Sequence, residues 1–137
     1  MTTAYIDGGS RGNPGPAGYG VRIVDENGQV QAELHQSLAH ATNNVAEYQG
    51  LLAALAWAQD RGLRRLHIRS DSELLVRQLK GEYRVKNPGL QPLYQEARER
   101  VARIGKVTFE HVRRELNREA DRLANLAMDE AAAGRSL

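Results

Sequence analysis

Four acidic residues stand where a carboxylate can take part in chemistry. Asp7 ends a short β-prone run, and four of the next eight residues are glycine, so the backbone there can come close to a ligand. Glu47 lies at the start of an expected helix, Asp71 follows an expected strand, and Asp121 lies early in the last expected helix. We expect these four carboxylates to converge on one site.

Such a cluster predicts a divalent-metal centre. Carboxylates without His or Cys partners are the ligand set of a hard cation, Mg²⁺ with Mn²⁺ as a substitute. Acids held close together do not all ionise cheaply, so a cluster of four calls for cations to neutralise it. Two ions about 3.5–4 Å apart activate water and stabilise the leaving oxygen in a phosphoryl displacement. Phosphodiester hydrolysis is the reaction that this pattern favours.

Each acid also has a plainer interpretation. Asp71 could serve only as the N-cap of its helix, and Asp121 only as a first-turn acid that the helix dipole favours. Glu47 fits a surface role least, because its neighbours at helical spacing, Leu51 and Ala54, are apolar. Its carboxylate is therefore expected above an apolar stripe that faces the sheet.

The expected elements place these acids. In chain order they are strands over 2–7, 19–24 and 29–38, a helix over 45–61, a strand over 63–69, helices over 73–79 and 90–104, a strand over 107–109 and a helix over 117–133. This order predicts an α/β fold, a mixed five-stranded sheet with helices on both faces and right-handed parallel crossovers. Residues 1–134 are expected to form a single domain, with 135–137 as a frayed C-terminal tail.

Composition narrows the class of protein. The chain is 41% hydrophobic and 26% charged, it contains no cysteine, and it lacks the apolar runs of a signal peptide or a membrane span. We expect a cytoplasmic monomer without disulfides. Sixteen of the nineteen basic residues are arginine, whose guanidinium suits phosphate oxygens. The alternative is that arginine simply replaces lysine on solvated faces.

Four segments together resemble the signatures of type 1 ribonuclease H. They are residues 7–20, 42–47, 70–72 and 117–125, which read DGGSRGNPGPAGYG, TNNVAE, SDS and NREADRLAN. The resemblance runs from about residue 2 to residue 128. It implies a ribonuclease H-like fold with strand order 3-2-1-4-5. It also implies endonucleolytic cleavage of the RNA strand of an RNA–DNA hybrid, with 5′-phosphate and 3′-hydroxyl ends.

The resemblance also implies roles for individual residues. Asp7 would bridge two metal ions, Asp121 would help hold the ion that activates water, and Glu47 and Asp71 would hold the ion near the leaving oxygen. Glu47 and the backbone of residues 8–10 would meet ribose 2′-hydroxyls, which distinguish RNA from DNA. The implied substrate-binding residues are Gly8, Gly9, Ser10, Asn13, Thr42, Asn43 and Asn44.

Some of these polar residues have a structural alternative that can coexist with contact. Thr42 and Asn43 are also good helix caps, and Asn13 can close a turn. His40 stands where many family members carry an arginine beside the pocket for a DNA-strand phosphate. Its part in binding is therefore open.

Two departures from the family pattern predict differences in activity. Many members carry a mobile histidine in a longer loop before the last helix, whereas residues 112–117 are short and contain no histidine. Glu115 or Arg114 are the candidates to replace it, and His111 is expected within the strand instead. We expect slower turnover.

The second departure lies between residues 79 and 90, where several members insert a basic helix that grips the hybrid. This chain has only Lys80, Tyr83, Arg84 and Lys86 there. Tyr83 either stacks on nucleic acid or anchors the connection by packing. We therefore expect weaker and more salt-sensitive binding than in longer relatives.

Rival functions remain open at this point. One is a relative that also cuts double-stranded RNA or acts at RNA–DNA junctions. Another is a catalytically silent module that only binds hybrids. The presence of all four acids argues against the silent module, because buried acids without a metal are costly.

Overall fold

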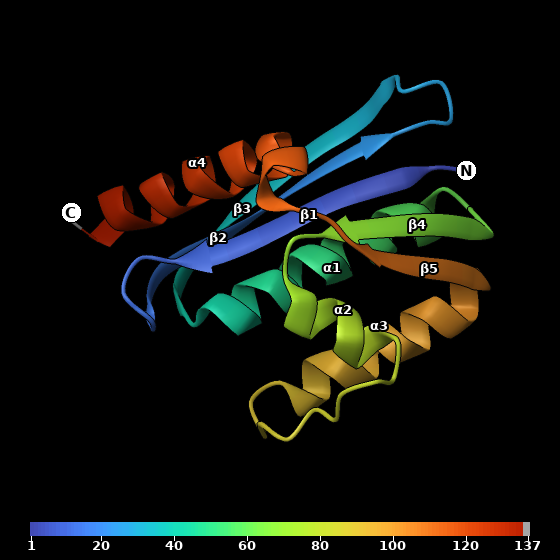
Figure 1. Ribbon diagram of the computed structural model, residues 1–137. Helices are drawn as coiled ribbons and strands as arrows, with labels where there is room; N and C mark the ends of the chain where they lie inside the picture. The colour runs from blue at the N-terminus through green and yellow to red at the C-terminus, as the bar shows by residue number, and fades with distance from the viewer. Residues whose placement is uncertain (136–137) are drawn as a thin grey trace.

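The computed structural model describes residues 1–135, with side chains through residue 134 (Figure 1). Five strands and four helices follow the expected order. They are β1 (Thr3–Ser10), β2 (Gly15–Val24), β3 (Val30–Ala41), α1 (Asn43–Asp60), β4 (Arg65–Ser70), α2 (Glu73–Leu79), α3 (Gln91–Ile104), β5 (Lys106–His111) and α4 (Arg118–Arg135), with a 3₁₀ turn, η1 (Arg114–Leu116), before α4.

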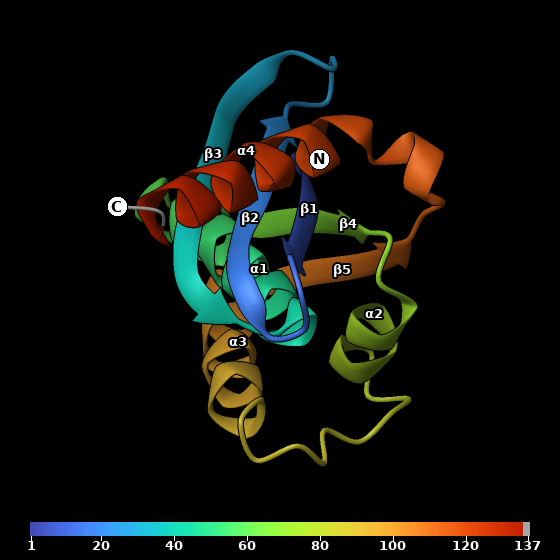
Figure 2. The same ribbon diagram turned by 90° about the vertical axis from the view of Figure 1, so that its left-hand side faces the viewer.

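The five strands form one mixed sheet in the order β3-β2-β1-β4-β5, which confirms the prediction. The first three strands form an antiparallel meander, and β4 and β5 continue the sheet in parallel with β1. Helix α4 lies across β1 to β3 on one face, whereas α1 covers the opposite face with α3 packed against it (Figures 1 and 2). Within residues 1–135, α4 does not extend over β4 and β5.

Alternation along the strands explains this layering. Ala4 and Ile6 of β1 and Val21 of β2 point toward α1, and all three are buried with Leu51 and Leu55 of that helix. Burying each large aliphatic side chain contributes about 1.5–3 kcal/mol. The residues between them point toward α4, and this second face is where Asp7 emerges.

Glycines in β2 bring α4 unusually close to the sheet. A Cβ atom at Gly18 would stand 2.4 Å from Ala127 Cβ, and one at Gly20 would stand 2.5 Å from the Ala120 carbonyl oxygen. Because Gly20 pairs directly with Asp7 across β1 and β2, the helix turn that carries Asp121 can lie against Asp7.

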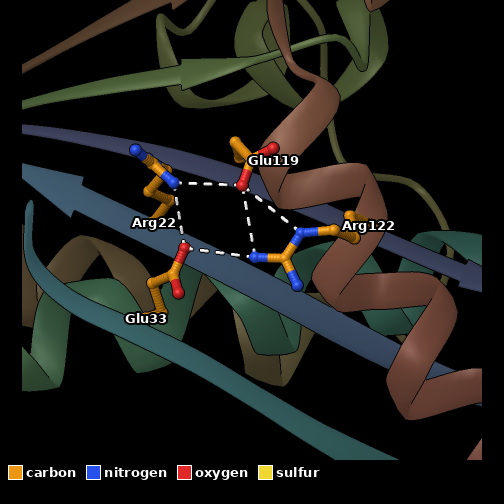
Figure 3. A network of polar contacts seen from close by, with 4 residues as sticks. All are labelled: Arg22, Glu33, Glu119 and Arg122. Carbon is orange, nitrogen blue, oxygen red and sulfur yellow. Dashed lines mark hydrogen bonds and ion pairs between the residues drawn. The ribbon is translucent and has the colours of Figure 1, made fainter.

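An ion-pair network also ties the start of α4 to the meander. Arg22 of β2 contacts Glu33 of β3 and Glu119 of α4, each at 3.0 Å, and Arg122 contacts the same two acids at 3.3 and 3.2 Å (Figure 3). These side chains are partly exposed, so each pair contributes no more than about 1 kcal/mol. The network orients the first turn of α4, where Glu119 lies two residues before Asp121.

Several boundaries differ from those expected. β1 continues to Ser10 and β2 begins at Gly15, because strand pairing extends into the glycine-rich stretch that looked like a loop. β5 is six residues long instead of three, since it pairs with the whole of β4. Arg135 is the last residue of α4, and residues 136–137 of the expected tail lie outside the described part of the chain. Among residues 1–135, no helix has the length and apolarity needed to cross a membrane.

Candidate active site

The four predicted acids line one cleft of about 790 Å³. Asp7 lies in β1 and Asp71 immediately follows β4, so the two emerge side by side just beyond the last parallel pair of β1 and β4. Glu47 comes from the second turn of α1, and Asp121 from the first turn of α4. The fold thus brings the four side chains together in one cleft, as the sequence predicted.

Gly8 allows α1 to reach this cleft. A Cβ atom at Gly8 would stand 2.4 Å from the carbonyl carbon of Ala46 and 2.5 Å from the backbone nitrogen of Glu47. No real Cβ contact is that short, so any side chain here would push α1 and its acid away from the strand. Glycine at this position is therefore needed for packing as well as for access to a ligand.

Asn117 anchors the other helix. Its side chain is 1% exposed, and Nδ2 donates a 2.8 Å hydrogen bond to the carbonyl oxygen of Ile6, the residue before Asp7. Its own carbonyl accepts from the Asp121 backbone N–H at 3.0 Å, the first turn of α4. One buried residue thus links both acids, and it was not among the residues predicted for the site.

The electrostatics of Asp7 are those of an acid without a positive partner. Burial, the neighbouring charge of Asp71 and a hydrogen bond with the Asp121 carboxyl raise the pKa of Asp7 to about 8, and the Gly8 N–H donor opposes this only in part. In the absence of a cation the Asp7 carboxyl is therefore much harder to ionise than a free aspartic acid.

Glu47 behaves in the same way. Burial raises the pKa of Glu47 to about 7, with a smaller contribution from the charge of Asp71, while a hydrogen bond from the Ser72 hydroxyl lowers it. The Ser72 oxygen also accepts from the Leu75 N–H at 3.2 Å, so Ser72 is the N-cap of α2. The alternative that Asp71 serves as that cap is therefore wrong.

The donor set fits a hard divalent cation. All four acids offer oxygen, although within residues 1–135 no three or more acidic or histidine side chains are already arranged as a complete metal site. Mg²⁺ commonly binds one or two carboxylates and completes its octahedron with waters and substrate phosphates. A divalent ion would also favour the ionised forms that burial disfavours here.

The predicted substrate-binding residues divide into two groups. Five of them line the cleft, namely Gly8, Gly9, Ser10, Asn43 and Asn44. Asn13 and Thr42 are not part of the lining. Asn13 Oδ1 accepts from the Asn43 N–H at 3.0 Å. Thr42 caps α1 by accepting from the Val45 N–H at 3.2 Å. Their contacts with a substrate stay predictions.

A hydrogen-bond relay connects these two groups. Asn43 Oδ1 accepts from the Ser10 N–H at 2.8 Å, so the end of β1 is tied to the first turn of α1. Asn13 in turn reaches the Asn43 N–H, so its side chain bonds to the helix as well as lying in the turn. These contacts hold the glycine-rich segment at the rim of the cleft.

The short segment before α4 also faces the cleft. His111 lies in β5, as expected, and lines the cleft together with Arg114 and Glu115 of η1. Arg114 is 81% exposed, and its Nη2 stands 4.0 Å from Asp121 Oδ1. Of the two candidates to replace the family's loop histidine, Arg114 is the one with a recorded contact to a predicted metal ligand.

Ser72, Asn125 and Met128 also line the cleft, as do Val112 and Arg113, although the sequence did not predict them as site residues. Ser72 and Asn125 lie within the segments that resemble the family signatures, and their position there could have identified them as site residues. Met128 packs near Gly9, where a Cβ atom would stand 3.3 Å from its sulfur. Only the fold places it there.

Comparison with known proteins decides the family. Residues 5–127 match the family model described as reverse transcriptase-like. Ribonuclease HI of Halobacterium salinarum is 43% identical over 128 residues, which are 93% of this chain and 64% of that protein. The chain belongs to the ribonuclease H family. The resemblance to type 1 ribonuclease H is thereby confirmed.

Solved structures support the same assignment of this ribonuclease H-family chain. The N-terminal RNase H domain of Rv2228c from Mycobacterium tuberculosis is 44% identical, with a TM-score of 0.94 over 98% of this chain and 97% of that one. LC11-RNase H1, solved in complex with an RNA/DNA hybrid, is 42% identical, with a TM-score of 0.87 over 96% and 99%.

This ribonuclease H-family chain spans only part of several relatives. It covers 35% of the bifunctional mycobacterial protein Rv2228c, to which it is 47% identical over 127 residues.

Proposed function

We propose that this protein is an endonuclease that hydrolyses the RNA strand of RNA–DNA hybrids and leaves 5′-phosphate and 3′-hydroxyl ends. The observation that carries the proposal is the cleft in which Asp7, Glu47, Asp71 and Asp121 meet from four different elements. Family membership and the hybrid complex of LC11-RNase H1 support the choice of substrate.

The acids would hold two divalent cations, Mg²⁺ with Mn²⁺ as a substitute. Asp7 stands beside both Asp121 and Asp71, which suits it to bridge two ions, while Glu47 lies on the Asp71 side. When bound, the cations supply the charge that activates water and stabilises the leaving 3′ oxygen. The chain itself orients the acids through Gly8, Asn117 and Ser72, and so sets where those charges stand.

Selectivity for RNA would come from the rim of the cleft. Gly8, Gly9 and Ser10 present strand backbone without bulky side chains beside Glu47. Backbone groups and a carboxylate at that position suit recognition of ribose 2′-hydroxyls, which DNA lacks. Asn43 and Asn44 add amides at the helix end of the same rim.

The decisive experiment is cleavage of a uniform RNA–DNA hybrid with labelled RNA, in Mg²⁺ and in Mn²⁺. Matched RNA–RNA and DNA–DNA duplexes, a hybrid with one RNA–DNA junction and the variant Asp7→Asn accompany it. We expect cutting of the hybrid alone, with loss of at least three orders of magnitude in Asp7→Asn, roughly 4 kcal/mol of transition-state stabilisation.

Other outcomes select the rival functions. Equal cutting of RNA–RNA would identify a relative with broadened activity. Hybrid binding without cutting in either metal would identify a silent binding module. A cytoplasmic location and a monomeric state stay predictions.

A further inference from the structure

Five polar side chains form a connected set on the part of the sheet that α4 leaves open. Helix α4 packs on β1, β2 and β3, and in the described part of the chain it does not extend over the same face of β4 and β5 (Figure 2). The set, which we call the strand clamp, consists of Tyr5 in β1, His67 and Arg69 in β4, and Thr108 and Glu110 in β5.

Arg69 is the centre of the strand clamp. Its Nη1 donates a 2.6 Å hydrogen bond to the Tyr5 hydroxyl, and its Nε donates a 2.9 Å bond to Glu110 Oε1. The guanidinium carbon also lies 5.4 Å from the centroid of the Tyr5 ring. One side chain therefore joins three neighbouring strands.

The strand clamp lies next to the cleft, and its residues in β1 and β4 precede Asp7 and Asp71. Tyr5 pairs with Arg69 across the parallel strands, and this pairing ends one residue later, so Asp7 and Asp71 each lie just beyond the last pair. Side chains alternate along a strand, so Asp7 follows Tyr5 on the same face, about 6.6 Å further along. Main-chain pairing does not hold β1 and β4 together at the acids themselves.

The charges of the clamp are balanced within it. Hydrogen bonds from His67, at 2.7 Å, and from Arg69 hold the pKa of Glu110 below its ordinary value, so Glu110 is a carboxylate beside the guanidinium. A neutralised guanidinium does not repel a cation in the cleft as a free one would. The action of Arg69 on the cleft is therefore geometric.

We propose that Arg69 is a positioning residue, which sets the separation of the Asp7 and Asp71 carboxylates and thereby the affinity of the cleft for divalent cations. The inference deepens the proposed function and rests on it. Indirect ligand support of this kind changes metal affinity by about tenfold or more in other sites.

The test is Mn²⁺ binding to the whole protein, measured by titration calorimetry without nucleic acid. Tyr5→Phe keeps the ring and removes only the hydroxyl that Arg69 holds. Arg69→Lys keeps the charge but gives up the planar guanidinium that reaches both partners. We expect both variants to bind Mn²⁺ about tenfold more weakly than the wild type. Addition of high Mn²⁺ restores most of their activity on a hybrid.

Thr108→Val is the matched control. It removes the 2.6 Å contact between the Thr108 hydroxyl and His67, two pairs further from the acids, and leaves Arg69 bridging its two partners. We expect a lower melting temperature with wild-type Mn²⁺ affinity. Equal weakening in this control, or wild-type affinity in Tyr5→Phe, would overturn the positioning role. Failure of the wild type to bind Mn²⁺ would instead remove the proposed metal site and the inference with it.

Discussion

At the scale of single residues, the fold places the acids of the candidate site so close together that each disfavours the ionised form of its neighbours. Asp7 and Glu47 are both partly buried, and both stand near the charge of Asp71. Such an arrangement costs stability in the absence of cations and provides the charge that a divalent ion needs. At these positions, the acids that favour cation binding lower the stability of the cation-free protein.

The first prediction concerns Asp7→Asn in chelator. Because folding raises the pKa of Asp7 from about 3.8 to about 8, the folded protein binds more protons than the unfolded chain between these values, and stability falls as pH rises through this window. The variant removes this loss. We expect its free energy of unfolding at pH 8 to exceed that of the wild type by roughly 1–3 kcal/mol, with the difference vanishing toward pH 4.

Urea unfolding over this pH range measures the effect. Asp60→Asn, an exposed position at the opposite end of α1 from Glu47, controls for loss of one negative charge. A wild type that is the more stable of the two at pH 8 would contradict the burial argument for Asp7.

The second prediction concerns η1. Arg114 stands 4.0 Å from Asp121 and is almost fully exposed, so it is free to meet a phosphate at the cleft. We expect Arg114→Ala to lower kcat on a hybrid by about tenfold, which is 1.4 kcal/mol of barrier. Arg118→Ala, a neighbouring exposed arginine outside the lining of the cleft, is the control. Normal turnover in Arg114→Ala with a slow Glu115→Gln would assign the role to Glu115.

At the scale of secondary-structure elements, the cleft exists because two helices closely approach two neighbouring strands, β1 and β2. Gly8 admits α1 from one face of the sheet, and Gly20 admits α4 from the other. The Arg22, Glu33, Glu119 and Arg122 network then orients α4, while Asn117 fastens its first turn to β1 (Figure 3). Each helix brings one acid to the two carried by the strands.

The third prediction compares two adjacent glycines of β1. In Gly8→Ala the new methyl meets the backbone of Ala46 at 2.4 Å, whereas in Gly9→Ala it meets only the flexible end of Met128 at 3.3 Å. We expect Gly8→Ala to lower the free energy of unfolding by about 3 kcal/mol, and Gly9→Ala by less than about 1 kcal/mol.

Chemical denaturation of the two variants side by side measures this difference. The comparison controls for the general effect of alanine in a strand, because both positions lie in β1. Equal stability of the two variants would show that α1 moves away from β1 at little cost. The close approach of α1 to Gly8 would then not be what positions Glu47.

At the scale of the whole molecule, a small net charge is made from many arginines. The chain has a formal charge of +2 with nineteen basic and seventeen acidic residues, and many of the arginines are already paired with acids on the surface. The connection between α2 and α3 carries only a few basic residues and no additional helix. Grip on a hybrid must then come mostly from contacts at the cleft.

The fourth prediction is weak and strongly salt-dependent hybrid binding. Phosphate contacts release counterions, so affinity falls with a slope on logarithmic axes of roughly 0.7–0.9 per contact. We expect fluorescence anisotropy with Asp7→Asn, the variant expected to be inactive, to show at least a tenfold loss of affinity between about 50 and 200 mM salt. A longer ribonuclease H with the additional basic helix serves as the reference. Affinity as insensitive to salt as that of a neutral protein would contradict the idea.

The sequence by itself determined the order of elements and predicted the ligand chemistry. Four acids without cysteine predict a hard cation, and hydrophobic periodicity with turn residues specified a meander followed by αβ units, including α2 over Glu73–Leu79 without error. These features are local, since residue type and short-range spacing carry them. Strand ends were less predictable, because β5 owes its length to its partner β4.

Only the tertiary structure decided how the acids meet and what holds them. The raised pKa of Asp7 depends on burial and on Asp71 and Asp121, which are distant in the chain. Asn117 reaches Ile6 across 111 positions, and Arg69 reaches Tyr5 across 64. Such effects arise from packing between elements, and no local pattern encodes the distance between two side chains on different strands.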